Sequence, residues 1–159
     1  MIDGPYFVLT VLGALACGLA AGVFAAFSTF VMKGLAALPP ARGIAAMNAI
    51  NVTAVGPAFM ALFLGATGLC AVLAVVTFVL WPQDGTAELL LGCALHLFGS
   101  FGVTVVAHVP RDEALAEVDP DSEVGAAYWR AYVREWTAWN HVRGIASLAA
   151  SACFLLALT

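Results

Sequence analysis

The sequence predicts an all-α protein, a transmembrane four-helix bundle that forms a single domain over residues 1–159. Three observations predict it: 63% of the residues are hydrophobic, only 10% are charged, and the apolar residues gather in four runs. Soluble domains carry about 25% charged residues, and a helix needs roughly 20 apolar residues to cross a bilayer core. The expected membrane helices cover about residues 6–32, 57–81, 87–107 and 136–158.

The first run, residues 6–32, is expected to remain a membrane helix and not to act as a signal peptide. No Lys or Arg precedes it, and it is longer than the apolar core of a typical signal peptide. Pro39 and Pro40 then predict a short interfacial helix over about residues 41–53, since proline suits a first helical turn. One face of that helix, at helical spacing, consists of Ile44, Met47, Asn48 and Asn51.

The second membrane helix is expected to begin at Pro57 and to end at Pro82. The third is expected to end at the sequence His-Val-Pro of residues 108–110. Along the third helix a polar residue recurs every four positions, at His96, Ser100, Thr104 and His108. For His96, near mid-membrane, the plain interpretation is a neutral imidazole that bonds a neighbouring helix.

Asp119 and Pro120 predict a helix N-cap followed by proline at the first helical position. A helical cytoplasmic extension over about residues 120–135 follows, with aromatic residues of the kind that collect at membrane interfaces. It either continues into residues 136–158 as one long helix bent near Gly144 or forms a separate interfacial helix.

The basic residues predict the orientation in the membrane, because positive charge concentrates in cytoplasmic connections. All six lie in or beside the first and third connections: Lys33, Arg42, Arg111, Arg130, Arg134 and Arg143. Loops 1 and 3 are therefore expected in the cytoplasm and both termini outside, in a multi-pass protein of the inner (plasma) membrane.

The net charge of −4 offers no basic surface for nucleic acid. It comes mostly from the third connection, where six acids are expected to be solvated: Asp112, Glu113, Glu117, Asp119, Asp121 and Glu123. The cysteines fall one in each apolar run, which favours apolar packing and no metal site: Cys17, Cys70, Cys93 and Cys153.

Polar residues concentrate in the octet Trp-Thr-Ala-Trp-Asn-His-Val-Arg of residues 136–143, where the last helix enters the membrane. Ionisable groups are costly there and indicate a function. Helical spacing places Trp136, Asn140 and Arg143 on one face and turns His141 away from Arg143. Further polar residues expected at this end of the bundle are Ser28, Thr29, Asn48 and Asn51. Together these residues predict a pocket with an apolar body and a polar rim for a hydrophobic small molecule.

The octet, the sequence Gly-Val-Phe-Ala-Ala-Phe-Ser-Thr-Phe-Val-Met of residues 22–32 and four shorter segments carry a family resemblance. The shorter segments are residues 38–40, 46–51, 99–104 and 109–110. On them the chain resembles the anthrone oxygenase-like family over nearly its whole length. The resemblance implies a four-helix membrane protein. Fungal members oxidise an anthrone to an anthraquinone with O2 and need no cofactor. Two positions depart from the family, which often has Asn in place of His108 and of Gly56.

The resemblance implies an oxygenase that acts on a flat, phenolic, lipid-soluble substrate such as an anthrone or a quinol. His108 or His141 would be the base that removes a C–H proton. Arg143 and Asn140 would stabilise the enolate. Two indoles, Trp136 and Trp139, would stack on the substrate rings, and Ser28, Thr29, Asn48 and Asn51 would line its site. No metal and no organic cofactor are expected.

Two alternatives remain open. A non-enzymatic membrane protein that binds a hydrophobic ligand or partner would use the polar stripes to join helices within the lipid bilayer. A homo-oligomer that buries the octet face fits this alternative. A haem or copper site using His96 and His108 is the other, but the two residues lie about 18 Å apart along one helix and cannot share a metal.

Overall fold

The computed structural model describes residues 4–82 and 84–159, and these residues form five helices and their connections. The first helix contains α1 (Gly4–Ala26), the π-helical η1 (Phe27–Val31) and α2 (Met32–Ala36). The short α3 (Pro40–Ala54) and the long α4 (Pro57–Leu80) follow. The next helix contains α5 (Thr86–Ala94), the π-helical η2 (Leu95–Gly102) and η3 (Thr104–His108), and α6 (Val109–Ala116). The last helix is α7 (Glu123–Leu156).

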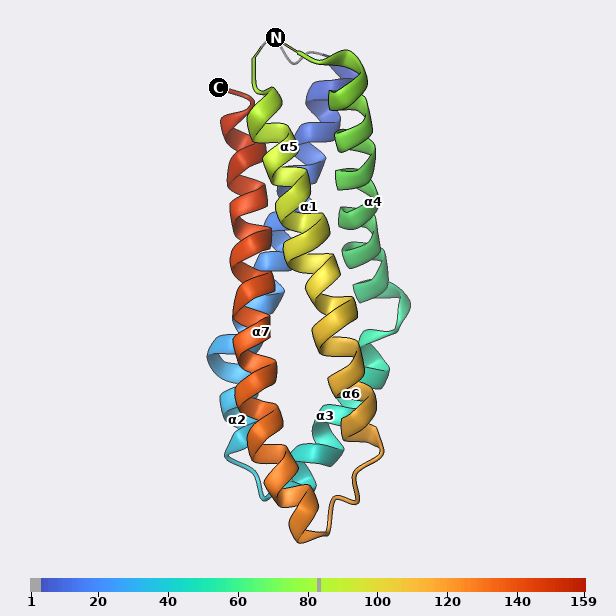
Figure 1. The fold of residues 1–159 in the computed structure, drawn as a ribbon, viewed down its shortest axis with the longest axis vertical. Helices are drawn as coiled ribbons and strands as arrows, with labels where there is room; N and C mark the ends of the chain where they lie inside the picture. Colours follow the sequence, from blue (N-terminus) through green and yellow to red (C-terminus); the bar gives the residue numbers. More distant parts are fainter. Residues whose placement is uncertain (1–3, 83) are drawn as a thin grey trace.

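Three of these helices are long and apolar enough to cross a membrane: Gly4–Ala36, Pro57–Leu80 and Thr86–Ala116. They run along a common axis with α7, and the start of α1 and the end of α7 lie at the same end of the molecule (Figure 1). The short α3 lies at the opposite end, beside α6 and the beginning of α7. Because α7 packs against the first helix and against α5 and η2, it joins most of the bundle.

The outer surface of the long helices is apolar, as expected for contact with lipid. More than half of each of the following side chains is exposed: Leu15, Leu19, Val75, Phe78, Phe98 and Leu148. The buried contacts form separate clusters, and the one at the α3 end is rich in aromatic residues. It comprises Met32, Leu35, Ile44, Met47, Leu115, Trp129, Tyr132 and Trp136. Gly43 allows this packing, since a Cβ atom there would lie 2.7 Å from the Trp129 indole.

Two helix boundaries expected from the sequence are wrong. The third long helix does not end at Pro110 but continues through it to Ala116. Arg111 donates from Nη1 to the carbonyl of Ala107 at 2.7 Å, which satisfies a backbone acceptor close to the proline. The N-cap of α7 is Ser122, not Asp119, because the Ser122 Oγ accepts the backbone N–H of Gly125 at 2.9 Å.

The expected helical extension and the last apolar run form one unbroken helix of 34 residues, which excludes the separate interfacial helix that the sequence left open. This continuity fixes the register between the aromatic residues near its start and the polar octet. Tyr132, Trp136, Asn140 and Arg143 consequently lie on one buried face of α7.

The expectation that Asp112 is solvated is also wrong. Its Oδ1 accepts the Tyr132 hydroxyl at 2.5 Å and the Trp136 Nε1–H at 3.1 Å. Because the third helix continues past Pro110, it carries Asp112 onto the aromatic face of α7. The carboxylate thus joins α6 to α7 at the α3 end of the bundle.

We expect Tyr132→Phe to destabilise the fold by about 1.5–3 kcal/mol, the range for a hydrogen bond to a charged group. Burial, reinforced by the neighbouring Asp112, raises the pKa of Tyr132 above its ordinary value of about 10. The folded state therefore holds this proton more tightly than the unfolded state does. The associated stability is complete below pH of about 10 and falls as the pH rises further.

The measurement is thermal unfolding of the detergent-solubilised protein, followed by circular dichroism at neutral and alkaline pH. Tyr128→Phe is the matched control, one helical turn away on α7. Equal melting temperatures for wild type and Tyr132→Phe at neutral pH would contradict the role given to this bond.

Candidate functional site

Arg143 is a buried cation held in a fixed position on α7, with 8% of its surface exposed. Its Nε donates to the Asn140 Oδ1 at 2.7 Å, and its Nη1 donates to the Thr104 Oγ1 at 3.3 Å. The guanidinium carbon lies 4.3 Å from the ring centre of Phe24 and 5.1 Å from that of Trp136, so both aromatic rings favour the charge. Among the described residues no carboxylate lies within 4.0 Å of the guanidinium. The charge is therefore not neutralised by a direct ion pair within the described residues.

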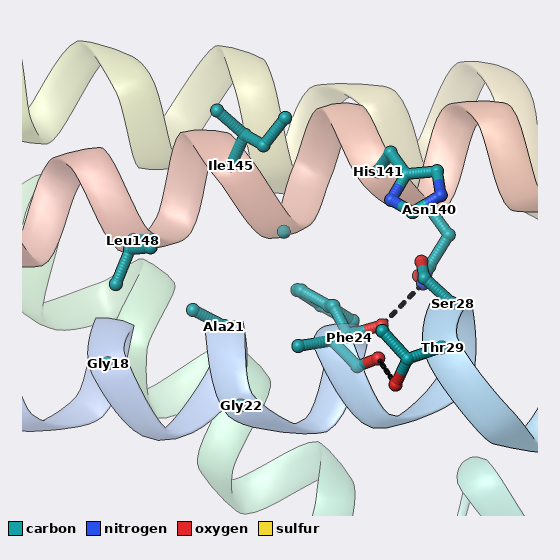
Figure 2. A pocket seen from close by; sticks show the side chains of 12 residues that line it. Gly18, Ala21, Gly22, Phe24, Ser28, Thr29, Asn140, His141, Ile145 and Leu148 are labelled. Carbon is teal, nitrogen blue, oxygen red and sulfur yellow. Dashed lines mark hydrogen bonds between the residues drawn. The ribbon is translucent and has the colours of Figure 1, made fainter.

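Asn140 connects Arg143 to the first helix and is fully buried. Its Nδ2 donates to the carbonyl of Phe24 at 2.7 Å and to the Ser28 Oγ at 2.6 Å (Figure 2). Ser28 lies in the π-helical η1, and Phe24 lies in α1 one turn before it. Since its amide protons are used in these bonds, Asn140 acts in this structure by positioning Arg143.

His108 is 1% exposed and lies at the end of η3. Its imidazole meets the Trp136 ring edge-on, with centres 4.8 Å apart and an interplanar angle of 82°. Neither Nδ1 nor Nε2 has a hydrogen-bond partner among the residues that the structure describes. A buried polar group without a partner costs about 1–3 kcal/mol, so such groups often indicate a function.

Two further buried polar atoms without a partner in the described part of the chain lie on α3, the Oδ1 of Asn48 and the Nδ2 of Asn51. Asn51 lies beside Asp112 and Tyr132. Unsatisfied polar atoms, a buried guanidinium and a half-buried carboxylate thus gather at one end of an otherwise apolar bundle.

A groove with a volume of about 330 Å³ lies between α1 and α7 (Figure 2). Small residues of both helices line it, including Gly18, Gly22 and Gly144. Its polar lining residues are Ser28, Thr29, Asn140 and His141. A second groove of about 430 Å³ includes Ser28, Thr29 and His141 and extends to Lys33 and Arg134. Asn140 thus lies between the first groove and the buried Arg143.

The structure brings together some of the predicted site residues and separates others. Those connected by contacts through α7 are His108, Trp136, Asn140, Arg143 and Ser28. His141 and Thr29 line the grooves, and the Thr29 hydroxyl donates to the carbonyl of Ala25 within its own helix. Trp139 is 39% exposed and lies outside the connected group.

Sequence reasoning missed Asp112, although a signal for it existed. The polar stripe of the third helix repeats every four residues up to His108, and Asp112 is the next position of that repeat. The proline at position 110 obscured this continuation, since it predicted the end of the helix.

A protein-family model described as anthrone oxygenase matches residues 59–153. The matched segment contains His108, Asp112, Trp136, Asn140 and Arg143. No curated protein and no solved structure matches the chain.

Proposed function

Since the chain belongs to the anthrone oxygenase family, we propose that it oxidises a flat, phenolic, lipid-soluble substrate, such as an anthrone or a quinol, with O2. In this proposal α7 is a fourth membrane span in a multi-pass protein of the inner (plasma) membrane. The positions of the basic residues favour loops 1 and 3 in the cytoplasm and both termini outside. The reaction site then lies at the cytoplasmic end of the bundle.

One observation carries the proposal: two buried groups contact Trp136. One is an imidazole whose nitrogens have no hydrogen-bond partner among the described residues, and the other is a guanidinium with no carboxylate within 4.0 Å among them. The two groups supply what anthrone oxidation demands of a protein. A neutral imidazole accepts a proton from carbon, and a fixed cation stabilises the enolate that forms. The apolar surroundings strengthen the second effect, because little water screens the attraction between the guanidinium and the enolate.

The reaction balances without a further reductant. His108 removes one proton from the methylene carbon of the anthrone, and Arg143 stabilises the resulting enolate. The enolate carbon transfers electrons to O2, a C–O bond forms, and the returning proton completes a hydroperoxide. Loss of the second C–H proton and cleavage of the O–O bond then release water. One anthrone and one O2 give one anthraquinone and one water.

The groove between α1 and α7 offers the substrate a route from the lipid. Its volume of about 330 Å³ lies within the size range of small-molecule sites. Asn140 separates the groove from Arg143, so local movement of helix packing is required before the substrate contacts the guanidinium and His108. In the proposed site Trp136 stacks on the substrate, and Asn48 and Asn51 of α3 bind its phenolic oxygens.

The proposal is tested with purified protein in lipid nanodiscs and a hydroxylated anthrone under O2. Quinone absorbance and O2 consumption should rise together in a one-to-one ratio, above the autoxidation seen with empty nanodiscs. With ¹⁸O2, one labelled oxygen should enter the quinone. A rate no higher than that of empty nanodiscs, for hydroxylated anthrones and quinols alike, would contradict the proposal.

A second function, the binding of a hydrophobic ligand without turnover, is favoured by the near-complete burial of His108. In the same experiment it predicts saturable binding of the anthrone to the protein with no excess of quinone. The two functions are therefore distinguished by product formation alone.

A further inference from the structure

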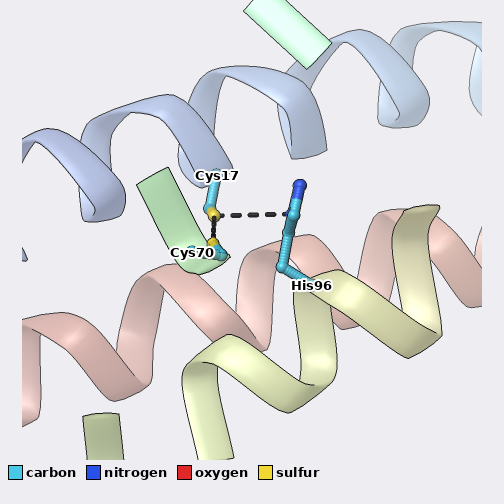
Figure 3. Close-up of side chains that lie close together, drawn as sticks. All are labelled: Cys17, Cys70 and His96. Carbon is cyan, nitrogen blue, oxygen red and sulfur yellow. Dashed lines mark hydrogen bonds between the residues drawn. The ribbon is translucent and has the colours of Figure 1, made fainter. Parts of the chain in front are cut away.

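Cys17 of α1, Cys70 of α4 and His96 of η2 form a fully buried cluster in the bundle (Figure 3). The two sulfur atoms lie 3.6 Å apart, and the Cys17 Sγ lies 3.5 Å from the His96 Nδ1. All three ligand atoms lie within 4.8 Å of one another. We propose that these residues bind one Cu(I) ion, a metal site separate from the oxygenase site.

The distances between the ligand atoms suit the binding of a single metal ion. Metal bonds of about 2.3 Å to sulfur and about 2.0 Å to nitrogen place the donor atoms of one site about 3.5–4 Å apart. The observed distances, 3.6 Å between the two sulfur atoms and 3.5 Å between the Cys17 Sγ and the His96 Nδ1, fall at the lower end of this range. An ion can therefore bind with only small movements of side chains that three different helices already direct toward one point.

The second nitrogen of His96 supports the same conclusion. Its Nε2 lies 3.4 Å from the Thr67 Oγ1, and that hydroxyl donates its own proton to the carbonyl of Phe63 at 2.8 Å. The hydroxyl oxygen is thus an acceptor for an Nε2–H group. This arrangement leaves the Nδ1 lone pair directed at the sulfur atoms, and metal-binding histidines are commonly oriented by such a second hydrogen bond.

Two properties of the ligands, their number and their softness, indicate which metal ion the site binds. Thiolates favour Cu(I) and zinc among biological metals, but structural zinc sites almost always have four ligands. The described residues supply three, and the surrounding core is apolar, including Leu73, Leu89 and Phe154. Three-coordinate Cu(I) fits this site without water. Binding replaces thiol protons by the metal, so affinity should increase with pH.

This proposal does not depend on the oxygenase assignment. His96 and His108 are 12 positions, or about three helical turns, apart on one continuous helix. We expect removal of the copper to leave the rate of anthrone oxidation unchanged, so the failure of one proposal does not affect the other.

The test is an anaerobic Cu(I) titration of the full-length protein in detergent, against a chromophoric chelator. Wild type should bind one Cu(I) per chain, with two sulfur and one nitrogen ligands by X-ray absorption. Cys70→Ser keeps the side-chain size and should weaken binding about 100-fold or more, since it removes a direct ligand. Thr67→Val should weaken it by about 10–100-fold while one ion still binds.

Cys93→Ala is the matched control, because Cys93 is buried in the same core and lies outside the cluster. It should bind Cu(I) as wild type does, and circular dichroism establishes that each variant is folded. Absence of Cu(I) binding, or equal affinity of wild type and Cys70→Ser, would overturn the proposal. Tight Zn(II) binding that Cu(I) cannot displace would overturn the choice of ion.

Discussion

Arg143→Leu is expected to lower kcat for anthrone oxidation by about 10²–10³-fold, or about 2.7–4 kcal/mol, the usual effect of removing one donor to a developing oxyanion. The guanidinium is buried, has no carboxylate within 4.0 Å in the described residues, and lies in contact with Trp136. Leucine preserves apolar packing at this place but offers no charge to the enolate. Because the charge develops mainly in the transition state, kcat should fall much more than KM changes.

Arg143→Lys should recover only part of the rate. Lysine restores the charge, but it cannot bond Asn140 and Thr104 at the same time with the geometry of the guanidinium. Arg134→Leu is the matched control, since the Arg134 side chain on the same helix is 79% exposed. A folded Arg143→Leu variant with the wild-type kcat would remove Arg143 from the mechanism.

The sequence predicted an all-α protein with long apolar helices correctly, because such helices leave a clear signal in composition. Three of the four expected spans are long and apolar enough to cross a membrane. It predicted helix boundaries less well where local rules competed. Pro110 ordinarily ends a helix, yet the third helix continues, with the Arg111 side chain bonded to the Ala107 carbonyl. Asp119 and Ser122 are both good N-cap residues, and only the chain path shows that the serine bonds the Gly125 N–H.

For the candidate site too, helical periodicity predicted which residues share a face but not which residues of other helices they contact. Helical spacing placed Asn140 and Arg143 on one face of α7, and both are buried. Spacing alone could not reveal that the Asn140 amide is used by Phe24 and Ser28, because those contacts join residues more than a hundred positions apart. The exposure of Trp139 likewise depends on neighbouring helices, not on its own segment.

His108→Ala is expected to lower the rate by about 10²–10⁴-fold, the usual effect of losing a general base, whereas His141→Ala should stay within about twofold of wild type. Both residues are histidines, but their surroundings differ. His108 is buried against Trp136, which also contacts Arg143. His141 lies on the exposed surface of α7 and lines the groove.

His108→Asn gives a sharper test than alanine, because asparagine still forms hydrogen bonds but cannot accept a proton near neutral pH. It also introduces asparagine, the residue that the anthrone oxygenase-like family often has at this position. We expect the variant to remain folded and to lose activity by about 10²–10⁴-fold, as the alanine variant does, because no group at this position accepts the proton. If His108→Asn kept the wild-type rate while His141→Ala lost it, the base would be His141, and the reaction would take place in the groove between α1 and α7.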